Sequence, residues 1–128
     1  MKPAEPIVKE TVMRIHRMQI ARHGGMDGLR DEGLLEAAIA QPWQGFGGVE
    51  LYPSLVEKAA RIGYEVVSQH PFNDGNKRTG AALVGALLRA NGARFKPKAD
   101  DYCRVILGVA DGTLGYDDLL EFVKRSVG

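Results

Sequence analysis

The chain has 128 residues, of which 45% are hydrophobic and 26% are charged, and this balance excludes an intrinsically disordered chain. Its length predicts one domain over residues 1–128 with a single buried core. Seventeen basic and sixteen acidic side chains leave a formal net charge of +1, so the chain lacks the global field that recruits nucleic acid or an anionic membrane.

Two features of the sequence favour a cytoplasmic location. Cys103 is the only cysteine, so no intrachain disulfide can form. Its apolar neighbours predict a small buried side chain rather than a nucleophile. The first ten residues contain no apolar run typical of a signal peptide, and the longest uncharged apolar run, residues 80–88, is too short to cross a bilayer.

The first part of the chain predicts two amphipathic helices and then a non-helical segment. Residues 7–22 place apolar side chains at spacings of three and four, and a pair of glycines follows them. Asp31 is positioned to cap a second helix, EGLLEAAIAQ, which stops before a proline. Residues 41–53 contain three glycines, two prolines and three aromatic residues, which predicts a loop or short hairpin.

The second part of the chain predicts four more helices. A helix that opens at residues 53–54 ends near His70, because a following proline disfavours helical backbone in the residue before it. Residues 76–91 have an apolar face broad enough to run through the centre of the domain. Residues 100–110 and 116–127 are two further helices. The sequence therefore predicts an all-α, compact bundle of about six helices.

The turn between the third and fourth predicted helices, HPFNDGNKRT (residues 70–79), concentrates polar and charged groups. A helix that begins at Gly75 or Asn76 points its unpaired N–H groups and the positive end of its dipole at this turn, which makes an anion site. Gly75 also allows the backbone to approach a ligand closely. Lys77 and Arg78 place cations where the dipole favours acids, so a bound oxyanion such as a nucleotide phosphate would offset their repulsion.

The other side chains of the turn are suited to separate tasks. Asp74 has the chemistry to hold Mg²⁺ beside bound phosphates, and the His70 imidazole can accept a proton from an attacking hydroxyl. We expect Phe72 to anchor the loop in the core and Asn76 either to bind a phosphate or to fix the loop. Each residue alone is typical of an ordinary helix end or turn, but their convergence within ten positions favours a functional site.

The turn resembles the signature of the Fic/Doc family, His-Pro-Phe-x-Asp/Glu-Gly-Asn-Gly/Lys-Arg, and residues 70–78 fill every specified position. The segment RHGGMDGLRDEGLLEAAIAQP and the later RANG are similar to the Doc (death on curing) toxin subclass. The resemblance implies the Fic fold, with His70 as the general base and Asp74 as the Mg²⁺ ligand. The remaining implied residues bind the nucleotide phosphates: Gly75, Asn76, Lys77 and Arg78.

Two positions bear on the reaction that the resemblance implies. Family members transfer part of a nucleotide, most often AMP, to a protein hydroxyl. Lys77 stands where AMP-transferring members keep a glycine, and Ala81 stands where they usually carry a second arginine. Both differences resemble the Doc subclass, which implies kinase-like transfer of the ATP γ-phosphate to a Ser/Thr hydroxyl of elongation factor Tu and arrest of translation. Pro71 and Gly75 are closer to the AMP-transferring branch, so an AMP transferase stays open. An inert nucleotide- or peptide-binding relative is a separate alternative.

The resemblance also implies a partner chain. Many Fic proteins restrain themselves with a Ser/Thr-x-x-x-Glu-Gly/Asn helix, but no serine or threonine here is followed by glutamate four residues later, and the nearest case is Thr113 with Asp117. We therefore expect a separate, Phd-like antitoxin to insert a helix near the motif. No membrane contact is expected, and the near-neutral charge argues against direct nucleic-acid binding.

Two further expectations concern the segment before the motif and two other histidines. The resemblance places a flap, which aligns the target segment, at residues 43–52, although Trp43 is more typical of a core anchor. We expect His16, within a helix, and His23, in its last turn, to have no part in the site.

Overall fold

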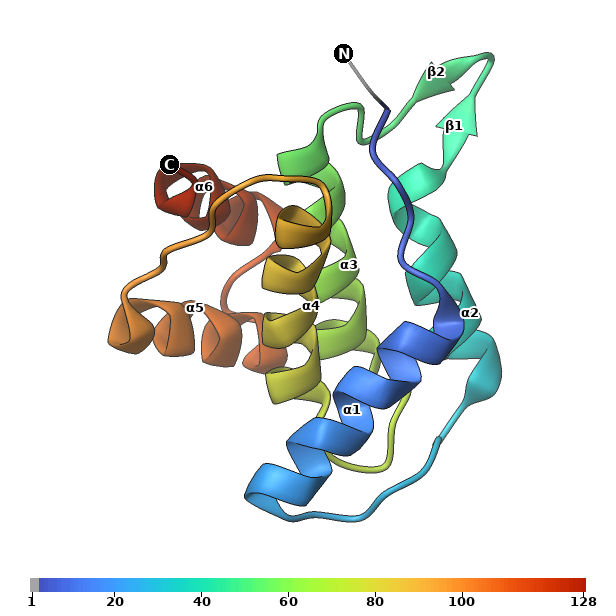
Figure 1. Cartoon of the computed structure of the whole chain (residues 1–128), viewed down its shortest axis with the longest axis vertical. Coiled ribbons are helices and arrows are strands. Elements are labelled where there is room, and N and C mark those ends of the chain that lie inside the picture. Colours follow the sequence, from blue (N-terminus) through green and yellow to red (C-terminus); the bar gives the residue numbers. More distant parts are fainter. Residues whose placement is uncertain (1–2) are drawn as a thin grey trace.

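The computed structural model describes residues 3–128, which form six α-helices and one short hairpin (Figure 1). The predicted all-α class and the six helices are confirmed. No helix in the described residues has the length and apolar character needed to cross a bilayer. In chain order the elements are α1 (Lys9–His23), α2 (Glu32–Ala40), the 3-10 turn η1 (Gln41–Trp43), β1 (Gly45–Phe46), β2 (Val49–Glu50), α3 (Leu55–Gln69), α4 (Asn76–Ala90), α5 (Ala99–Asp111) and α6 (Tyr116–Ser126).

The helix starts follow the capping signals in the sequence. Asp31 caps α2, since its Oδ1 accepts the N–H of Leu34 at 3.0 Å. Ser54 and Glu57 form a capping box at the start of α3, and each side chain accepts the other residue's N–H at 3.1 Å. α1 begins at Lys9, two residues later than predicted, and its N-cap residue Val8 has extended backbone and makes no side-chain cap.

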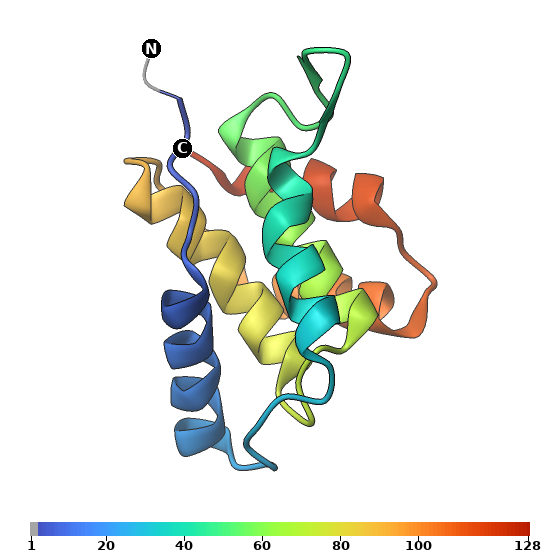
Figure 2. The ribbon, with the colours of Figure 1, turned by 90° about the vertical axis from the view of Figure 1, so that its right-hand side faces the viewer.

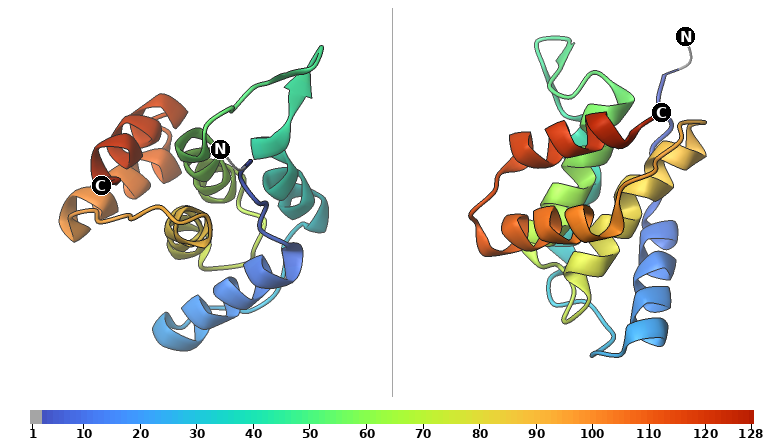
Figure 3. Two further views of the ribbon diagram at one scale, coloured as in Figure 1. Left: turned by 45° about the horizontal axis from the view of Figure 1, so that its top comes forward. Right: turned by 90° about the vertical axis from the view of Figure 1, so that its left-hand side faces the viewer.

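The central pair of the bundle is α3 and α4, with α1 and α2 on one side and α5 and α6 on the other (Figures 1 and 3). The prediction that residues 76–91 form the central helix is confirmed for α4, since five of its side chains are fully buried. α2 and α6 each contribute fully buried apolar side chains to the same core. Its largest fully buried aliphatic residues include Leu35, Ile62, Val66, Val67, Leu83, Val84, Leu87, Leu88 and Leu119.

Two facing glycines allow α3 and α4 to approach closely. A Cβ built at Gly63 would lie 2.4 Å from the Val84 Cγ2 atom. A Cβ built at Gly80 would lie 2.5 Å from the Val67 Cγ2 atom and 3.0 Å from the Gly63 carbonyl oxygen. Neither position has room for a methyl group, because the neighbours include buried side chains and rigid helix backbone. The absence of a side chain at both positions therefore sets the spacing of the central helix pair.

We expect Gly80→Ala to lower the free energy of unfolding by about 1–3 kcal/mol through overpacking, measured by urea denaturation. Gly85→Ala in the same helix is the matched control, because its methyl would meet only the flexible guanidinium end of Arg89, at 2.8 Å. There the gain in helix propensity, about 1 kcal/mol, should dominate. Equal effects of the two substitutions would contradict the packing argument.

The hairpin lies at the opposite end of α3 from the motif turn (Figure 2). It is tied to the first turns of α3 by Lys58, which is 3% exposed and donates to the carbonyl oxygens of Pro42 and Tyr52 and to the Glu50 carboxylate. The motif follows the last residue of α3, a helix of 15 residues and therefore roughly 22 Å long. A short hairpin was predicted correctly, but its expected place as a flap beside the motif is wrong.

Candidate active site

The motif turn begins with a residue in an unfavourable backbone conformation. His70 ends α3 with φ of 54° and ψ of 58°, and within residues 3–128 it is the one non-glycine residue at positive φ. Arg30 holds this end of the helix, donating from Nε to the His70 carbonyl at 2.6 Å and from a terminal nitrogen to the Gln69 carbonyl at 2.9 Å. The His70 side chain is exposed. Such an outlier, held in place by its surroundings, is characteristic of functional sites.

The interior of the turn is fixed by Phe72 and Asn76. Phe72 is fully buried, as an anchor of the loop requires. The Asn76 side chain closes the turn, since its Oδ1 accepts the Phe72 N–H and its Nδ2 donates to the Phe72 carbonyl, both at 3.0 Å. Of the two roles considered for the Asn76 side chain, the structure shows that it fixes the loop. Its backbone N–H remains one of the free donors in the first turn of α4.

His16, which the sequence alone did not implicate, supports the motif from beneath. It is fully buried in α1, its ring stacks on Phe72 with centroids 3.7 Å apart, and its Nε2 donates to the Asp74 carbonyl at 2.8 Å. Its Nδ1 has no hydrogen-bond partner among the described residues and lies 3.7 Å from Asp27 Oδ1. One signal in the sequence could have indicated that His16 is buried. It lies four residues after the buried Val12 and therefore on the same, core-facing side of the helix.

The segment 24–31, not the hairpin, runs beside the motif turn. Its backbone donates twice to the Pro71 carbonyl, at 2.8 and 3.0 Å, and Leu29 forms a β-bridge with Phe72. The Met26 N–H donates to Asp74 Oδ2 at 2.7 Å. A Cβ at Gly25, which has φ of 114°, would lie 3.1 Å from the Asp74 Cβ, so glycine allows this close approach. The place expected for residues 43–52 is therefore occupied by the loop after α1.

A cavity of about 800 Å³ opens at the N-terminus of α4. No side chain caps this helix among the described residues, and Gly75 precedes it with φ of 78°. Lys77 and Arg78 are exposed in its first turn. Except for the buried Phe72, all the predicted site residues line the cavity. The lining consists of His23, Gly24, Gly25, His70, Asn73, Asp74, Gly75, Asn76, Lys77, Arg78, Ala81, Ala99, Tyr102, Cys103, Ile106 and Leu107.

One wall of this cavity comes from α5, which no feature of the motif predicted. Cys103 is exposed on this wall, so the prediction of a buried cysteine is wrong. The reason is that the buried residues of α5, Ile106, Gly108 and Val109, all lie in its second half, whereas Cys103 lies in the first half. Tyr102 donates to the Ala81 carbonyl at 2.7 Å. Burial raises the pKa of Tyr102, so its hydroxyl stays protonated as a donor near neutral pH. His23 also lines the cavity, contrary to expectation.

The charges at the rim fit a phosphorylated ligand with a divalent cation. Free N–H groups and the dipole of α4 add to the charges of Lys77 and Arg78. Asp74 is exposed, and its Oδ1 has no partner among residues 3–128. The described residues contain no group of three His, Cys, Asp or Glu side chains able to hold a metal. A cation at Asp74 would therefore need oxygens from the ligand, and Mg²⁺ is commonly bound by one or two carboxylates together with substrate phosphates.

The fold and the site define a class of small all-α domains in which a glycine-led, basic helix N-terminus opens onto a cavity. The chain belongs to the Fic/DOC family, whose model matches residues 6–88. It is 40% identical over 77 residues to "Toxin Doc" of Mycolicibacterium smegmatis, a match that covers 60% of this chain and 59% of that protein. It is 30% identical over 124 residues to "Protein kinase doc" of Escherichia phage P1, a match that covers 95% of both chains.

Proposed function

We propose that this chain is the toxin of a toxin–antitoxin pair and that it transfers the γ-phosphoryl group of ATP to a Ser/Thr hydroxyl of elongation factor Tu, which arrests translation. The observation that carries the proposal is the uncapped, basic N-terminus of α4, which opens onto the cavity with His70 and Asp74 exposed at its rim. The name of one relative, a toxin, supports the toxin role, and the name of the other, a protein kinase, supports the reaction class.

The triphosphate would lie against the first turn of α4. The free backbone N–H groups there bind phosphate oxygens, Arg78 can contact two oxygens at once, and Lys77 supplies a point charge. The apolar side chains of Ile106 and Leu107 on α5 suit the base and ribose. Asp74 would hold Mg²⁺ through its free oxygen, and the ion would neutralise charge on the phosphate oxygens.

His70 would receive the proton of the target hydroxyl. In the transfer, the hydroxyl oxygen forms a bond to the γ-phosphorus while the bond to the β–γ bridging oxygen breaks, so ADP leaves and the imidazole takes the proton. Arg30 and the turn hold the His70 backbone in place before the substrate arrives. Positioning and fixed charges therefore supply most of the acceleration.

The experiment that tests this proposal compares ATP labelled at the α-phosphate with ATP labelled at the γ-phosphate. Purified elongation factor Tu and a translation extract are each incubated with the chain, Mg²⁺ and one of the two labels. Phosphoryl transfer leaves only the γ label on the target protein. Retention of the α label would identify an AMP transferase, and retention of neither label in any protein of the extract would indicate an inert relative.

Lys77→Gly is expected to weaken γ-phosphoryl transfer by roughly 10- to 100-fold, because a charge-assisted hydrogen bond to phosphate contributes about 1.5–3 kcal/mol. The same change removes a side chain that would occupy the space of an α-phosphate, so trace AMP transfer becomes possible. Lys77→Arg is the matched control, since it keeps both the charge and the bulk. It should retain most of the γ transfer and show no α label; AMP transfer by this control would contradict the space argument.

We also propose that a separate antitoxin chain of the Phd type restrains the toxin by placing a helix near the motif. The cavity is open, and the exposed apolar side chains Met26 and Leu107 lie beside it, which suits the apolar face of an amphipathic helix. Expression of the chain alone should arrest growth, and co-expression with the antitoxin should restore it. Harmless expression alone would count against a toxin.

A further inference from the structure

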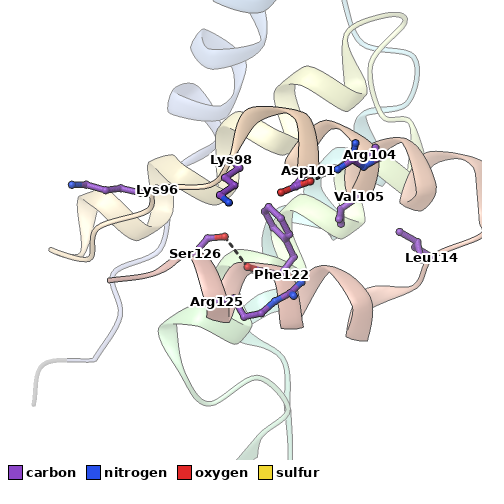
Figure 4. A pocket seen from close by; sticks show the side chains of 9 residues that line it. All are labelled: Lys96, Lys98, Asp101, Arg104, Val105, Leu114, Phe122, Arg125 and Ser126. Carbon is purple, nitrogen blue, oxygen red and sulfur yellow. Dashed lines mark hydrogen bonds and ion pairs between the residues drawn. The ribbon is translucent and has the colours of Figure 1, made fainter.

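A second cavity, of about 570 Å³, lies between α5 and α6 (Figure 4). Along α5, residues 101, 104 and 105 line this second cavity, whereas residues 99, 102, 103, 106 and 107 line the first. At about 100° of rotation per residue these two sets lie on opposite faces of the helix. We call the second cavity the α5–α6 groove, and it is separate from the proposed phosphotransfer site.

The α5–α6 groove is strongly basic although the whole chain is nearly neutral. Its lining contains four cations and one carboxylate, that of Asp101, which pairs with Arg104. No ion pair reaches the three other cations, Lys96, Lys98 and Arg125, from residues 3–128. An adjoining hollow, lined by Arg94 together with two of these cations, extends the charge toward the end of α6. The groove therefore presents an uncompensated positive field that suits an acidic ligand.

The backbone that carries these cations is held in place. The Lys96 N–H donates to the Ser126 carbonyl at 2.8 Å, and the Gly128 N–H donates to the Arg94 carbonyl at 3.2 Å. These bonds join the segment before α5 to the last residue of α6 and to the residues after it, and Phe95 forms a β-bridge with Val127 in the same region. The backbone that carries the cations is therefore fixed on both sides of the groove before a ligand binds, which lowers the entropic cost of binding.

The floor of the α5–α6 groove is apolar. Val105 and Leu114 are half-buried, and Phe122, which points from α6 toward α5, is 7% exposed (Figure 4). The Phe122 ring stacks on Tyr102, with centroids 5.4 Å apart, and the Arg125 guanidinium carbon lies 5.9 Å from its centroid. A basic rim around an apolar floor matches a segment that carries both acidic and apolar side chains.

The same geometry argues against single-stranded nucleic acid as the ligand. Proteins that bind single strands present open aromatic faces on which bases stack. In the groove, Phe122 is the one aromatic residue of the lining, and Tyr102 and Arg125 lie against its ring. We propose that the α5–α6 groove is a docking site for an acidic segment of a partner protein, with an apolar side chain of that segment against Val105 and Leu114.

The test uses a fluorescein-labelled synthetic peptide in which aspartates and glutamates surround two leucines. Its binding to the full chain is followed by fluorescence anisotropy at about 0.1 M salt. The double variant Lys98→Glu/Arg125→Glu should weaken binding at least about tenfold, because two charge attractions become repulsions. Both side chains are exposed, so the variant should remain folded, which circular dichroism and a melting curve verify.

The matched control is Arg14→Glu/Arg17→Glu, which makes the same change in net charge at exposed positions of α1. This control should change the affinity less than about twofold, since exposed charges beyond a Debye length, about 10 Å at 0.1 M salt, are largely screened. Equal weakening by both double variants would overturn the proposal, because it would show attraction to net charge alone. Saturating Mg²⁺ and ATP should leave peptide binding unchanged, and displacement of the peptide would place it in the motif cavity instead.

Two further probes test the class of partner. A peptide with both leucines replaced by serine should bind several-fold more weakly; equal binding would remove the apolar contact from the proposal. A labelled oligouridylate should bind more weakly than the leucine-containing peptide under the same conditions. Tighter binding of the oligouridylate, lost in Lys98→Glu/Arg125→Glu, would overturn a protein partner in favour of nucleic acid.

Discussion

His70→Ala is expected to lower the turnover rate of phosphoryl transfer at least roughly hundredfold, the contribution typical of a positioned general base. The His70 side chain is exposed and makes no hydrogen bond within the described residues, so its removal should leave the fold and the binding of ATP almost unchanged. The turnover rate should therefore fall while the KM for ATP stays similar. Transfer of the γ label to the target, measured over a range of ATP concentrations, checks both parameters.

The control for this substitution is His70→Asn, because position 70 has positive φ and asparagine tolerates that conformation better than alanine. Any loss caused only by backbone strain should then appear in the alanine variant and not in the asparagine variant. Loss in both variants, with unchanged melting temperatures, assigns the effect to the imidazole. Full activity of either variant would remove His70 from the role of base.

Phe72→Ala is expected to lower the free energy of unfolding by roughly 3–5 kcal/mol, the usual effect of deleting a fully buried aromatic ring. Phe72 is fully buried and stacks on His16. The change leaves a void between α1 and the turn, so the Asp74 carbonyl should also lose its fixed partner. Denaturant unfolding measures the stability, and a higher Mg²⁺ requirement for transfer at a temperature where the variant is folded measures the looser turn.

Phe46→Ala is the matched control for the buried ring, because Phe46 lies at the hairpin with 84% of its surface exposed. The same atoms are removed there without opening a cavity. Its effect on the free energy of unfolding should stay within about 0.5 kcal/mol, as for most exposed substitutions. A stability loss at position 46 as large as that at position 72 would show that burial does not explain the cost at Phe72.

Local signals predicted most of the fold because they depend on neighbouring residues. A capping side chain such as Asp31 acts within three residues, and Pro71 restricts the backbone of the residue directly before it. The breadth of an apolar face likewise predicts how deeply a helix such as α4 is buried. With these rules, the helix boundaries were predicted close to their observed positions. The motif residues were also predicted correctly to lie at the N-terminus of one helix.

The failures concern residues whose partners are far away in the sequence. His16 and Asp74 are 58 positions apart, and Arg30 contacts His70 across 40 positions. The family resemblance implied that residues 43–52 form the flap, but α3 separates the hairpin from the motif by its full length. Cys103 was predicted to be buried because its neighbours have apolar spacing, but the packing of α5 leaves it exposed beside the cavity. Contacts between residues so far apart in the sequence do not follow a helical period. No pattern among neighbouring residues therefore predicts which of them meet.

The sequence by itself determined the all-α class, the helix boundaries and the composition of the motif turn, since each follows from backbone preferences and periodicity over a few residues. Only the tertiary structure decided which loop lies against the motif, that His16 supports it, that α5 supplies a wall of the cavity, and that scattered cations gather in the α5–α6 groove. The physical reason is that long-range contacts are selected by the packing of whole helices, which depends on the shapes of all their faces together.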